Sequence, residues 1–332
     1  MIGPAISVVL PVYNGAADVK KAVESVLAQT FTDFELIIIN DGSKDQSASV
    51  LDGIHDSRIR LFHQDNAGLA ATLNRGIEMA RGRYIARQDQ DDLSLPQRFE
   101  KQFVYMEANP KCGLLGTRAD IWVGDAPSGR AHEHPSDHAT LRFELLFNNP
   151  FVHSSVMLRR DVLFDVGCYA TDPSRQPPED YELWSRIARY CEVANLPDHL
   201  LVYREVPASM SRTGTNPFVE KLVLICAENI AALLGSAEPS RDVLDVAAYT
   251  HSAFHLLSDN PNIGRMCEIV RQTGHVLEVI SPGYNIAALA ESRVVHLRHQ
   301  YLVHQHNADW VRSIVSLTRA ICCRLKSWVR QI

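Results

Sequence analysis

The sequence lacks the patterns that identify several common protein classes. It has seven cysteines in 332 residues, an odd number, and no two of them have the Cys-x-x-Cys spacing. This excludes a disulfide framework and a zinc knuckle and favours a reducing cytoplasm. Lys and Arg total 33 against 39 Asp and Glu, for a net charge of -6. Because a nucleic-acid surface needs an excess of basic residues, we expect no nucleic-acid partner.

Long apolar runs and glycine-rich phosphate loops are also absent. No apolar run reaches about 18 residues, the length that spans a bilayer, and the chain enters a strand-like segment without a charged and apolar leader. We therefore expect a protein that is neither exported nor membrane-spanning. There is no Gly-x-Gly-x-x-Gly after the first strand and no Gly-Lys-Ser/Thr loop. These absences argue against a dinucleotide-binding fingerprint and a P-loop.

Strand and helix patterns alternate through the first part of the chain. Hydrophobic residues make up 46% of the composition, which is typical of a globular protein with one large domain or two smaller ones. Strand, helix and strand in succession predict a doubly wound, mostly parallel α/β sheet flanked by helices, with its polar loops at one edge. The predicted strands are 6–10, 34–39, 58–63 and 83–88, the helices 16–29 and 68–81, and the loops 11–15, 40–45 and 89–92.

An acidic turn follows the last of these strands. Asp89, Asp91 and Asp92 place three carboxylates within four residues. Such groups repel one another unless they are fully solvated or bind a hard cation such as Mg²⁺ or Mn²⁺. The carboxyl end of a strand in an open α/β sheet is where ligands gather, which favours the cation. A solvated acidic loop that also caps the following helix remains the alternative.

Seven motifs in a fixed order resemble those of the inverting family 2 glycosyltransferases, which have the GT-A fold. The resemblance ends near Arg204, and the order makes it far more specific than any one motif. The motifs are Pro11–Gly15, Asn40–Ser43, Asn66–Gly68, Gly82–Asp92, Asn149–Met157, Glu179–Trp184 and Leu200–Arg204.

The resemblance implies a nucleotide-sugar donor and a divalent cation. Pro11, Tyr13 and Asp41 would form the nucleotide pocket, with Tyr13 against the base and Asp41 accepting from the imide of uracil or thymine. Asp89 and Asp91 match the family's DxD pair. Asp91 is the expected direct ligand of Mn²⁺ or Mg²⁺, and Asp89 is expected near the ribose or a metal-bound water.

Asp180 matches the family's catalytic base. A carboxylate opposite the diphosphate can take the proton of an acceptor hydroxyl as it attacks the anomeric carbon, which inverts that centre. Glu179 and Asp180 follow two prolines and open a predicted helix, so the two acids could instead only complement the helix dipole. Glu179 is a candidate contact to the acceptor or diphosphate.

The chain departs from the family pattern at two positions. Asn40 stands where the family commonly has Asp, and Val206 stands where many members have a His thought to help bind the metal or the diphosphate. A third metal ligand is therefore not identified. Arg204, or a segment at 209–212, could hold the diphosphate instead, because the guanidinium suits phosphate oxygens. His153 is expected either to face the crevice as a hydrogen-bonding group or to be a satisfied core histidine.

The sequence predicts two parts, a GT-A catalytic domain over 1–214 and a helical region over 215–332. The last segment, 310–332, has apolar residues at helical spacing and five basic residues without an acidic one. This pattern is typical of a basic amphipathic helix at a membrane surface. Packing on the protein and a dimer contact remain alternatives, and the oligomeric state is not predicted.

Together these features predict a metal-dependent inverting hexosyltransferase. It would move a sugar from a UDP- or dTDP-sugar to a hydroxyl of a glycan or lipid-linked acceptor, in bacterial surface polysaccharide or lipid-linked oligosaccharide synthesis. The expected location is the cytoplasm, either free or peripheral on the inner face of the membrane. The alternatives are a nucleotidyltransferase and an inactive sugar-nucleotide-binding protein. A nucleotidyltransferase would need a basic glycine-rich loop, which the sequence lacks. An inactive protein would be expected to have lost its acids, but this chain keeps Asp89, Asp91 and Asp180.

Overall fold

The computed structural model describes residues 3–206 and 218–306. The chain divides into two compact units, Met1–Ile225 and Cys226–Ile332. The predicted domain boundary between 214 and 215 lies outside the described residues and stays a prediction. The same holds for the amphipathic segment 310–332 and for the phosphate-binding alternative at 209–212.

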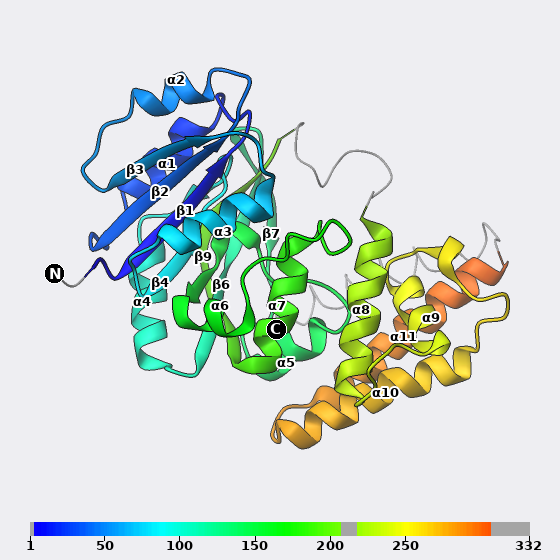
Figure 1. The fold of residues 1–332 in the computed structure, drawn as a ribbon. Coiled ribbons are helices and arrows are strands. Elements are labelled where there is room, and N and C mark those ends of the chain that lie inside the picture. Colours follow the sequence, from blue (N-terminus) through cyan, green and yellow to red (C-terminus); the bar gives the residue numbers. More distant parts are fainter. Residues whose placement is uncertain (1–2, 207–217, 307–332) are drawn as a thin grey trace. The chain divides into compact units, whose positions relative to one another are not determined.

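The first unit contains one nine-stranded sheet in the described part of the chain, in the order β3-β2-β1-β4-β8-β6-β9-β5, with β7 paired to β6. Figure 1 shows β3, β2, β1 and β4 side by side. The strands are β1 (Ile6–Val12), β2 (Phe34–Asp41), β3 (Ile59–Gln64), β4 (Tyr84–Arg87), β5 (Leu93–Ser94), β6 (Cys112–Val123), β7 (Ala126–His132), β8 (Met157–Arg159) and β9 (Glu192–Glu205).

The four strands predicted from the sequence are confirmed, and they pair in parallel. Parallel strands end at the same edge, so the loops after β1, β2 and β4 meet there. Two hydrogen bonds demonstrate this meeting. The N–H of Asn14 donates to Ser43 Oγ at 2.9 Å, and the N–H of Tyr13 donates to Gln90 Oε1 at 2.9 Å. The later strands add antiparallel pairs, so this half of the sheet is mixed.

Alternating side chains build a core on each face of the sheet. Val8 and Leu10 of β1 pack in one cluster, while Val9 packs in the other, as the two-residue period of a strand requires. The first cluster includes Val23 of α1, and the second includes Trp184 of α7. The α/β fold class, with helices on both faces, is therefore confirmed.

The helices of the first unit are, in part, shorter than predicted, because the flanking turns take up their ends. The expected helix 16–29 forms over Val19–Leu27, and the expected helix 68–81 forms over Leu69–Met79. The helical elements of this unit are α1 (Val19–Leu27), α2 (Ser47–Asp52), α3 (Leu69–Met79), α4 (Arg98–Ala108), α5 (His138–Glu144), η1 (His153–Ser155), α6 (Arg160–Val166) and α7 (Glu179–Tyr190).

The described part of the second unit is helical, as expected. Ser240 caps α9, its side chain accepting from the N–H of Val243 at 3.4 Å. No helix in residues 3–206 and 218–306 combines the length and apolar character needed to cross a bilayer. The remaining elements that the structure describes are α8 (Val219–Leu233), α9 (Arg241–Thr250), η3 (Phe254–Leu256), α10 (Ile263–Ile280) and α11 (Ile286–His306).

Candidate active site

The acidic turn after β4 is anchored by one of its own carboxylates. Asp92 is only 1% exposed, its Oδ1 accepts the backbone N–H of Arg204 at 2.8 Å, and its Oδ2 accepts the hydroxyl of Ser154. Burial, together with the charges of Asp89 and Asp91, raises the pKa of Asp92 well above its usual range. Asp92 therefore ties the turn to β9 and η1 and serves a structural purpose.

The carboxylate of Asp89 is paired with a buried guanidinium. Arg87, the last residue of β4, has a side chain that is 2% exposed and forms an ion pair with Asp89 Oδ1. A buried cation is costly unless it is paired, so Arg87 and Asp89 depend on each other. Among the residues that the structure describes, Asp91 forms no ion pair. Asp91 is thus the carboxylate of the turn that remains available to a cation.

The environment of Asp91 fits a divalent cation. Burial and the charge of Asp89 raise the pKa of Asp91 to about 6, which indicates that its negative charge is poorly compensated. Residues 3–206 and 218–306 contain no group of three or more His, Cys, Asp or Glu side chains arranged to hold a metal. Mg²⁺ is often bound in proteins through only one or two carboxylates, with substrate phosphates completing its coordination.

A second acidic pair lies at the start of α7. Glu179 is 7% exposed, and burial together with the charge of Asp180 raises its pKa to about 7. Burial also raises the pKa of Asp180. Asp180 Oδ2 accepts from Asn149 Nδ2 at 2.8 Å, and Oδ1 accepts the N–H of Tyr181 at 2.7 Å. Neutral donors therefore hold the Asp180 carboxylate, which orients it while leaving it able to accept a proton.

The two acidic groups form one electrostatic cluster. The charges of Arg87 and Asp89 shift the pKa of Asp91, and the same two charges shift the pKa values of Glu179 and Asp180. The contacts of η1 link the two groups in space, because Ser154 donates to Asp92 of the turn and the ring of His153 meets that of Trp184 in α7. The site thus combines a half-buried turn that suits a cation with a half-buried carboxylate held by amide donors.

The residues predicted for the nucleotide lie at the same edge of the sheet. Tyr13 follows β1 and is 48% exposed, whereas Pro11 is buried within β1. Asp41 ends β2, and its carboxylate accepts the N–H groups of Ala67 at 2.8 Å and Gly68 at 3.0 Å. Asp41 therefore also fixes the loop that begins α3. Its contact with a base imide stays a prediction.

Arg204, predicted as a diphosphate contact, is engaged with protein groups. Its Nη1 donates to Asp18 Oδ1 at 2.6 Å, its Nη2 donates to Asp125 Oδ1 at 2.8 Å, and its Nε donates to the carbonyl of Gly124 at 3.0 Å. These bonds join β9 to the segment before α1 and to the β6–β7 turn. Arg204 also braces the acidic turn, because its backbone N–H donates to Asp92 and its Nη1 donates to the carbonyl of Asp91 at 3.3 Å. The diphosphate contact stays a prediction. Val206 contributes no metal-ligating group.

His153 is hydrogen-bonded and packs against the aromatic side chains of Tyr169 and Trp184. Its Nε2 lies 2.9 Å from the Tyr169 hydroxyl, and its ring meets that of Trp184 edge-on with centroids 5.7 Å apart. Burial and the nearby charge of Arg87 lower the pKa of His153 well below its usual range, so the ring is neutral at pH 7. This arrangement favours the core alternative for His153, and an acceptor contact stays a prediction.

Three residues were not assigned a function from the sequence. Arg87 could have been singled out by one feature of the sequence, because it is a basic residue at the end of an otherwise apolar strand. Asn149 stands within a family motif but had no stated role, and it now orients Asp180. Gln90, between two aspartates, gave no local signal, because its partner is 77 positions away in the chain.

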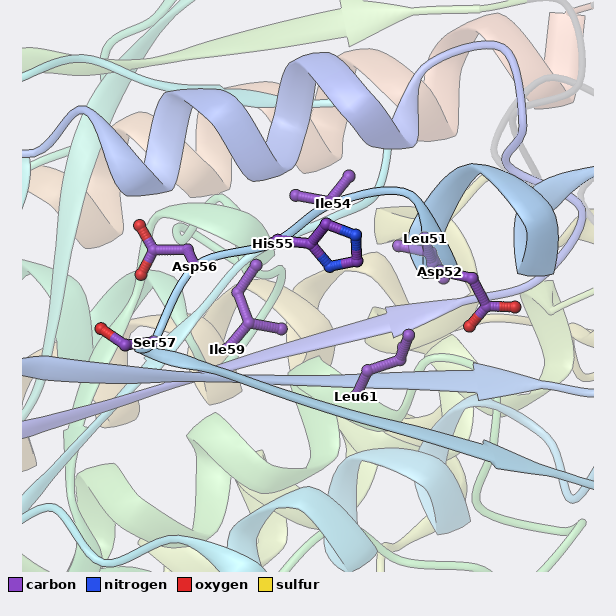
Figure 2. Close-up of a pocket in the computed structure, with 8 residues that line it drawn as sticks. All are labelled: Leu51, Asp52, Ile54, His55, Asp56, Ser57, Ile59 and Leu61. Carbon is purple, nitrogen blue, oxygen red and sulfur yellow. The ribbon is translucent and has the colours of Figure 1, made fainter.

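A surface hollow lies apart from this acidic cluster. It has a volume of about 550 Å³ and is lined by residues of α2, the following loop and the first part of β3. Figure 2 shows Ile54, Ile59 and Leu61 around it, with the carboxylates of Asp52 and Asp56 on opposite sides. The amino end of β3 is opposite the edge that holds the acidic turn. None of the predicted site residues is among the eight that line the hollow.

Comparisons with known proteins identify the family. The model of glycosyl transferase family 2 matches residues 7–167. The amylovoran biosynthesis glycosyltransferase AmsE of Erwinia amylovora is 32% identical over 204 residues, which cover 60% of this chain and 75% of AmsE. The chain belongs to glycosyl transferase family 2. An uncharacterized glycosyltransferase of Haemophilus influenzae is 31% identical over 212 residues, covering 60% of this chain and 65% of that relative.

The fold of this glycosyltransferase is similar to that of a solved structure. Residues 1–349 of S. aureus TarS, in complex with UDP-GlcNAc, superpose with a TM-score of 0.60. The superposition covers 91% of this chain and 92% of the TarS chain at 14% sequence identity. At this identity the likeness establishes the fold. It agrees with the GT-A architecture implied by the sequence motifs.

Proposed function

We propose that the chain is a metal-dependent inverting hexosyltransferase that uses a UDP- or dTDP-sugar. The observation that carries this proposal is the acidic cluster around Arg87. The charges of Arg87 and Asp89 act on both Asp91 and Asp180, but only Asp180 has its carboxylate oxygens held by the Asn149 amide and a backbone N–H. One carboxylate suits a cation beneath a diphosphate, and the other suits a proton acceptor. The TarS complex with UDP-GlcNAc supports a uridine nucleotide as the donor carrier.

The acidic turn would receive the donor's diphosphate. Asp91, with Asp89 beside it, would hold Mn²⁺ or Mg²⁺. When bound, such a cation supplies positive charge that stabilises the leaving diphosphate. Tyr13 at the same edge would contact the base, and Pro11 and Asp41 would shape its pocket. Because Arg87 already neutralises Asp89, Asp91 is the direct ligand in this proposal.

Asp180 would act as the general base. Each of its oxygens already accepts one hydrogen bond, and a carboxylate oxygen has a further lone pair for an acceptor hydroxyl. As the hydroxyl oxygen bonds to the anomeric carbon, its proton moves to Asp180 and the bond from that carbon to the diphosphate breaks. Attack opposite the leaving group inverts the anomeric centre. Glu179, next to Asp180, would contact the acceptor.

The acceptor in this proposal is a glycan or a lipid-linked oligosaccharide of a bacterial surface polysaccharide. The name of AmsE, an amylovoran biosynthesis glycosyltransferase, supports polysaccharide synthesis. The enzyme would act in the cytoplasm, at the inner face of the membrane, where the basic segment 310–332 would bind anionic lipid. Removal of 310–332 should move the protein from the membrane fraction to the soluble fraction. An unchanged distribution would reject this anchor.

The proposed activity is tested by a screen of UDP- and dTDP-sugars for hydrolysis and transfer, with and without Mn²⁺. We expect turnover with at least one donor and loss of turnover when EDTA removes the cation. Nuclear magnetic resonance of the product reports the anomeric configuration. A product that retains the donor's configuration would overturn the inverting mechanism while leaving the transferase assignment intact.

Two variants separate binding from chemistry. Asp180→Asn should keep the Kd of UDP but lower kcat by about 10²- to 10⁴-fold, the usual contribution of a general base. Asp91→Ala should weaken Mn²⁺ and UDP binding together. Asp198→Asn, at a surface pair with Lys101, is the matched control and should leave both quantities unchanged. Full activity of Asp180→Asn would remove Asp180 from the base role.

A further inference from the structure

Gln90, the residue between Asp89 and Asp91, forms two hydrogen bonds with a single partner. Its Oε1 accepts the N–H of Tyr13 at 2.9 Å, and its Nε2 donates to the carbonyl of Tyr13 at 3.1 Å. The side-chain amide therefore pairs with the backbone of Tyr13 much as a residue of a neighbouring strand would. A carboxylate or a thioether of similar length could not make both bonds, because neither has a donor.

The loop after Tyr13 is held from its other side by a different segment. The N–H of Asn14 donates to Ser43 Oγ, and the N–H of Gly15 donates to Ser47 Oγ, each at 2.9 Å. The N–H of Ala16 donates to the carboxylate of Asp45 at 3.0 Å. Residues 14–16 are thus tied to the loop after β2 and to the first residue of α2, whereas Gln90 ties Tyr13 to the acidic turn.

Gly15 provides the space in which the Gln90 side chain lies. A Cβ atom added at Gly15 would overlap Gln90 Oε1 and would lie 2.5 Å from Gln90 Cδ. The three nearest atoms to such a Cβ all belong to Gln90. Alanine at position 15 would therefore displace the Gln90 amide from Tyr13. The contact between the two loops depends on both the glutamine and the glycine.

We propose that Gln90 is a positioning residue that sets the distance between Tyr13 and the acidic turn to match a nucleoside diphosphate. This inference rests on the proposed function, in which the base lies against Tyr13 and the diphosphate lies at Asp91. The separation of base and diphosphate in a nucleotide is limited by its covalent structure. A site whose two contact points are already held at that separation loses less conformational freedom on binding.

Titration of UDP into the Gln90→Met variant tests the proposal. Methionine has a similar length but cannot pair with the Tyr13 backbone. We expect the Kd of UDP to rise about 2- to 10-fold, the range that one net hydrogen bond contributes, and the donor KM to rise while kcat changes little. Gln97→Met is the matched control, because Gln97 is exposed and makes no side-chain capping bond to α4.

A double-mutant cycle tests the link between the two positions. Gly15→Ala should raise the Kd of UDP in the wild-type background and add little in the Gln90→Ala background, because the added methyl then has room. The melting temperature measured through the same cycle reports the contact without nucleotide. Because Gly15 does not have a left-handed φ, alanine is compatible with its backbone.

The outcomes distinguish this inference from the proposed function. Failure of the wild-type chain to bind UDP or dTDP would overturn the proposed function, and this inference with it. Normal wild-type binding with an unchanged Kd in Gln90→Met would overturn the inference alone. Equal effects of Gly15→Ala in both backgrounds would also overturn it.

Discussion

The turn at 89–92 and the start of α7 both concentrate carboxylates, but the protein stabilises them in different ways. In the turn, Asp89 pairs with the buried guanidinium of Arg87, and Asp92 is fixed by hydrogen bonds to β9 and η1. At the start of α7, the carboxylate of Asp180 is held by the Asn149 amide and a backbone N–H. The turn uses a cation for Asp89 and neutral donors for Asp92, whereas Asp180 is held by neutral donors alone.

The difference accounts for the separate chemical tasks that we propose. The Asp89 carboxylate has an oxygen engaged by the Arg87 guanidinium, so it is less suited to meet the hydroxyl of an acceptor. A carboxylate held by amides in a buried site keeps a raised pKa, as Asp180 does, and accepts a proton more readily. The buried guanidinium of Arg87 is shared by both groups, because its charge acts on Asp91 and on Asp180.

The largest effect is expected when the guanidinium of Arg87, which both acidic groups share, is removed. In Arg87→Met, the buried carboxylates around position 87 lose their positive neighbour. We expect the free energy of unfolding at pH 7 to fall on the order of 3 kcal/mol, as when one partner of a buried ion pair is lost. The loss should be smaller at pH 5, where the carboxylates are more protonated. Urea unfolding at the two pH values measures both quantities.

Two further variants make this test specific. Arg87→Lys keeps the charge and should recover part of the lost stability. Arg83→Met removes a guanidinium that is 59% exposed and paired with Glu107, and it should cost less than about 1 kcal/mol, because surface ion pairs contribute little. Equal losses in Arg83→Met and Arg87→Met would contradict the central position that we assign to Arg87.

A smaller effect concerns the proton on Glu179. Its folded pKa of about 7 exceeds the ordinary value of 4.5, so the folded state binds the proton more tightly and stability falls as pH rises between these values. Glu179→Gln replaces the ionisable group with a neutral amide and removes this loss. We expect the variant to gain on the order of 2 kcal/mol relative to the wild type at pH 8 and nothing at pH 4.

Urea unfolding across this pH range checks the effect of Glu179→Gln. Glu268→Gln, at an exposed pair on α10, is the control and should show no gain that grows with pH. A constant difference between Glu179→Gln and the wild type at all pH values would contradict the raised pKa. Glu179 would then not belong to the coupled acidic group at the start of α7.

The parallel half of the sheet could be predicted because its signals are local. Apolar runs separated by amphipathic segments specify strand, helix and strand, and the right-handed connection places the ends of β1, β2 and β4 together. Tyr13, Asp41 and Asp91 follow or end those strands, so their shared edge could be inferred from spacing alone. The start of α7 at Glu179 was similarly marked by the prolines before it.

The contacts of Arg204 and Gln90 could not be predicted, because they join segments that are distant in the sequence. Arg204 meets Asp18 and Asp125, and Gln90 meets Tyr13, through pairings that no local pattern encodes. The charges that Arg87 acts on likewise include distant ones, because Glu179 and Asp180 of α7 follow far later in the chain. An isolated arginine at the end of a strand would ordinarily be expected to reach solvent.

The finest test of the comparison concerns the amide that holds Asp180. Asn149→Ala removes the donor to Asp180 Oδ2, so the carboxylate loses both orientation and stabilisation of its ionised form. We expect kcat to fall about 3- to 10-fold, equivalent to one net hydrogen bond, with an unchanged Kd for UDP. The acidic limb of the kcat profile should also move to higher pH.

Asn109→Ala removes an equivalent half-buried amide that donates to the carbonyl of Tyr105, and it should leave kcat unchanged. If Asn149→Ala weakened UDP binding instead, Asn149 would belong to the donor side, and the division between the cation-paired turn and the amide-held base would be wrong.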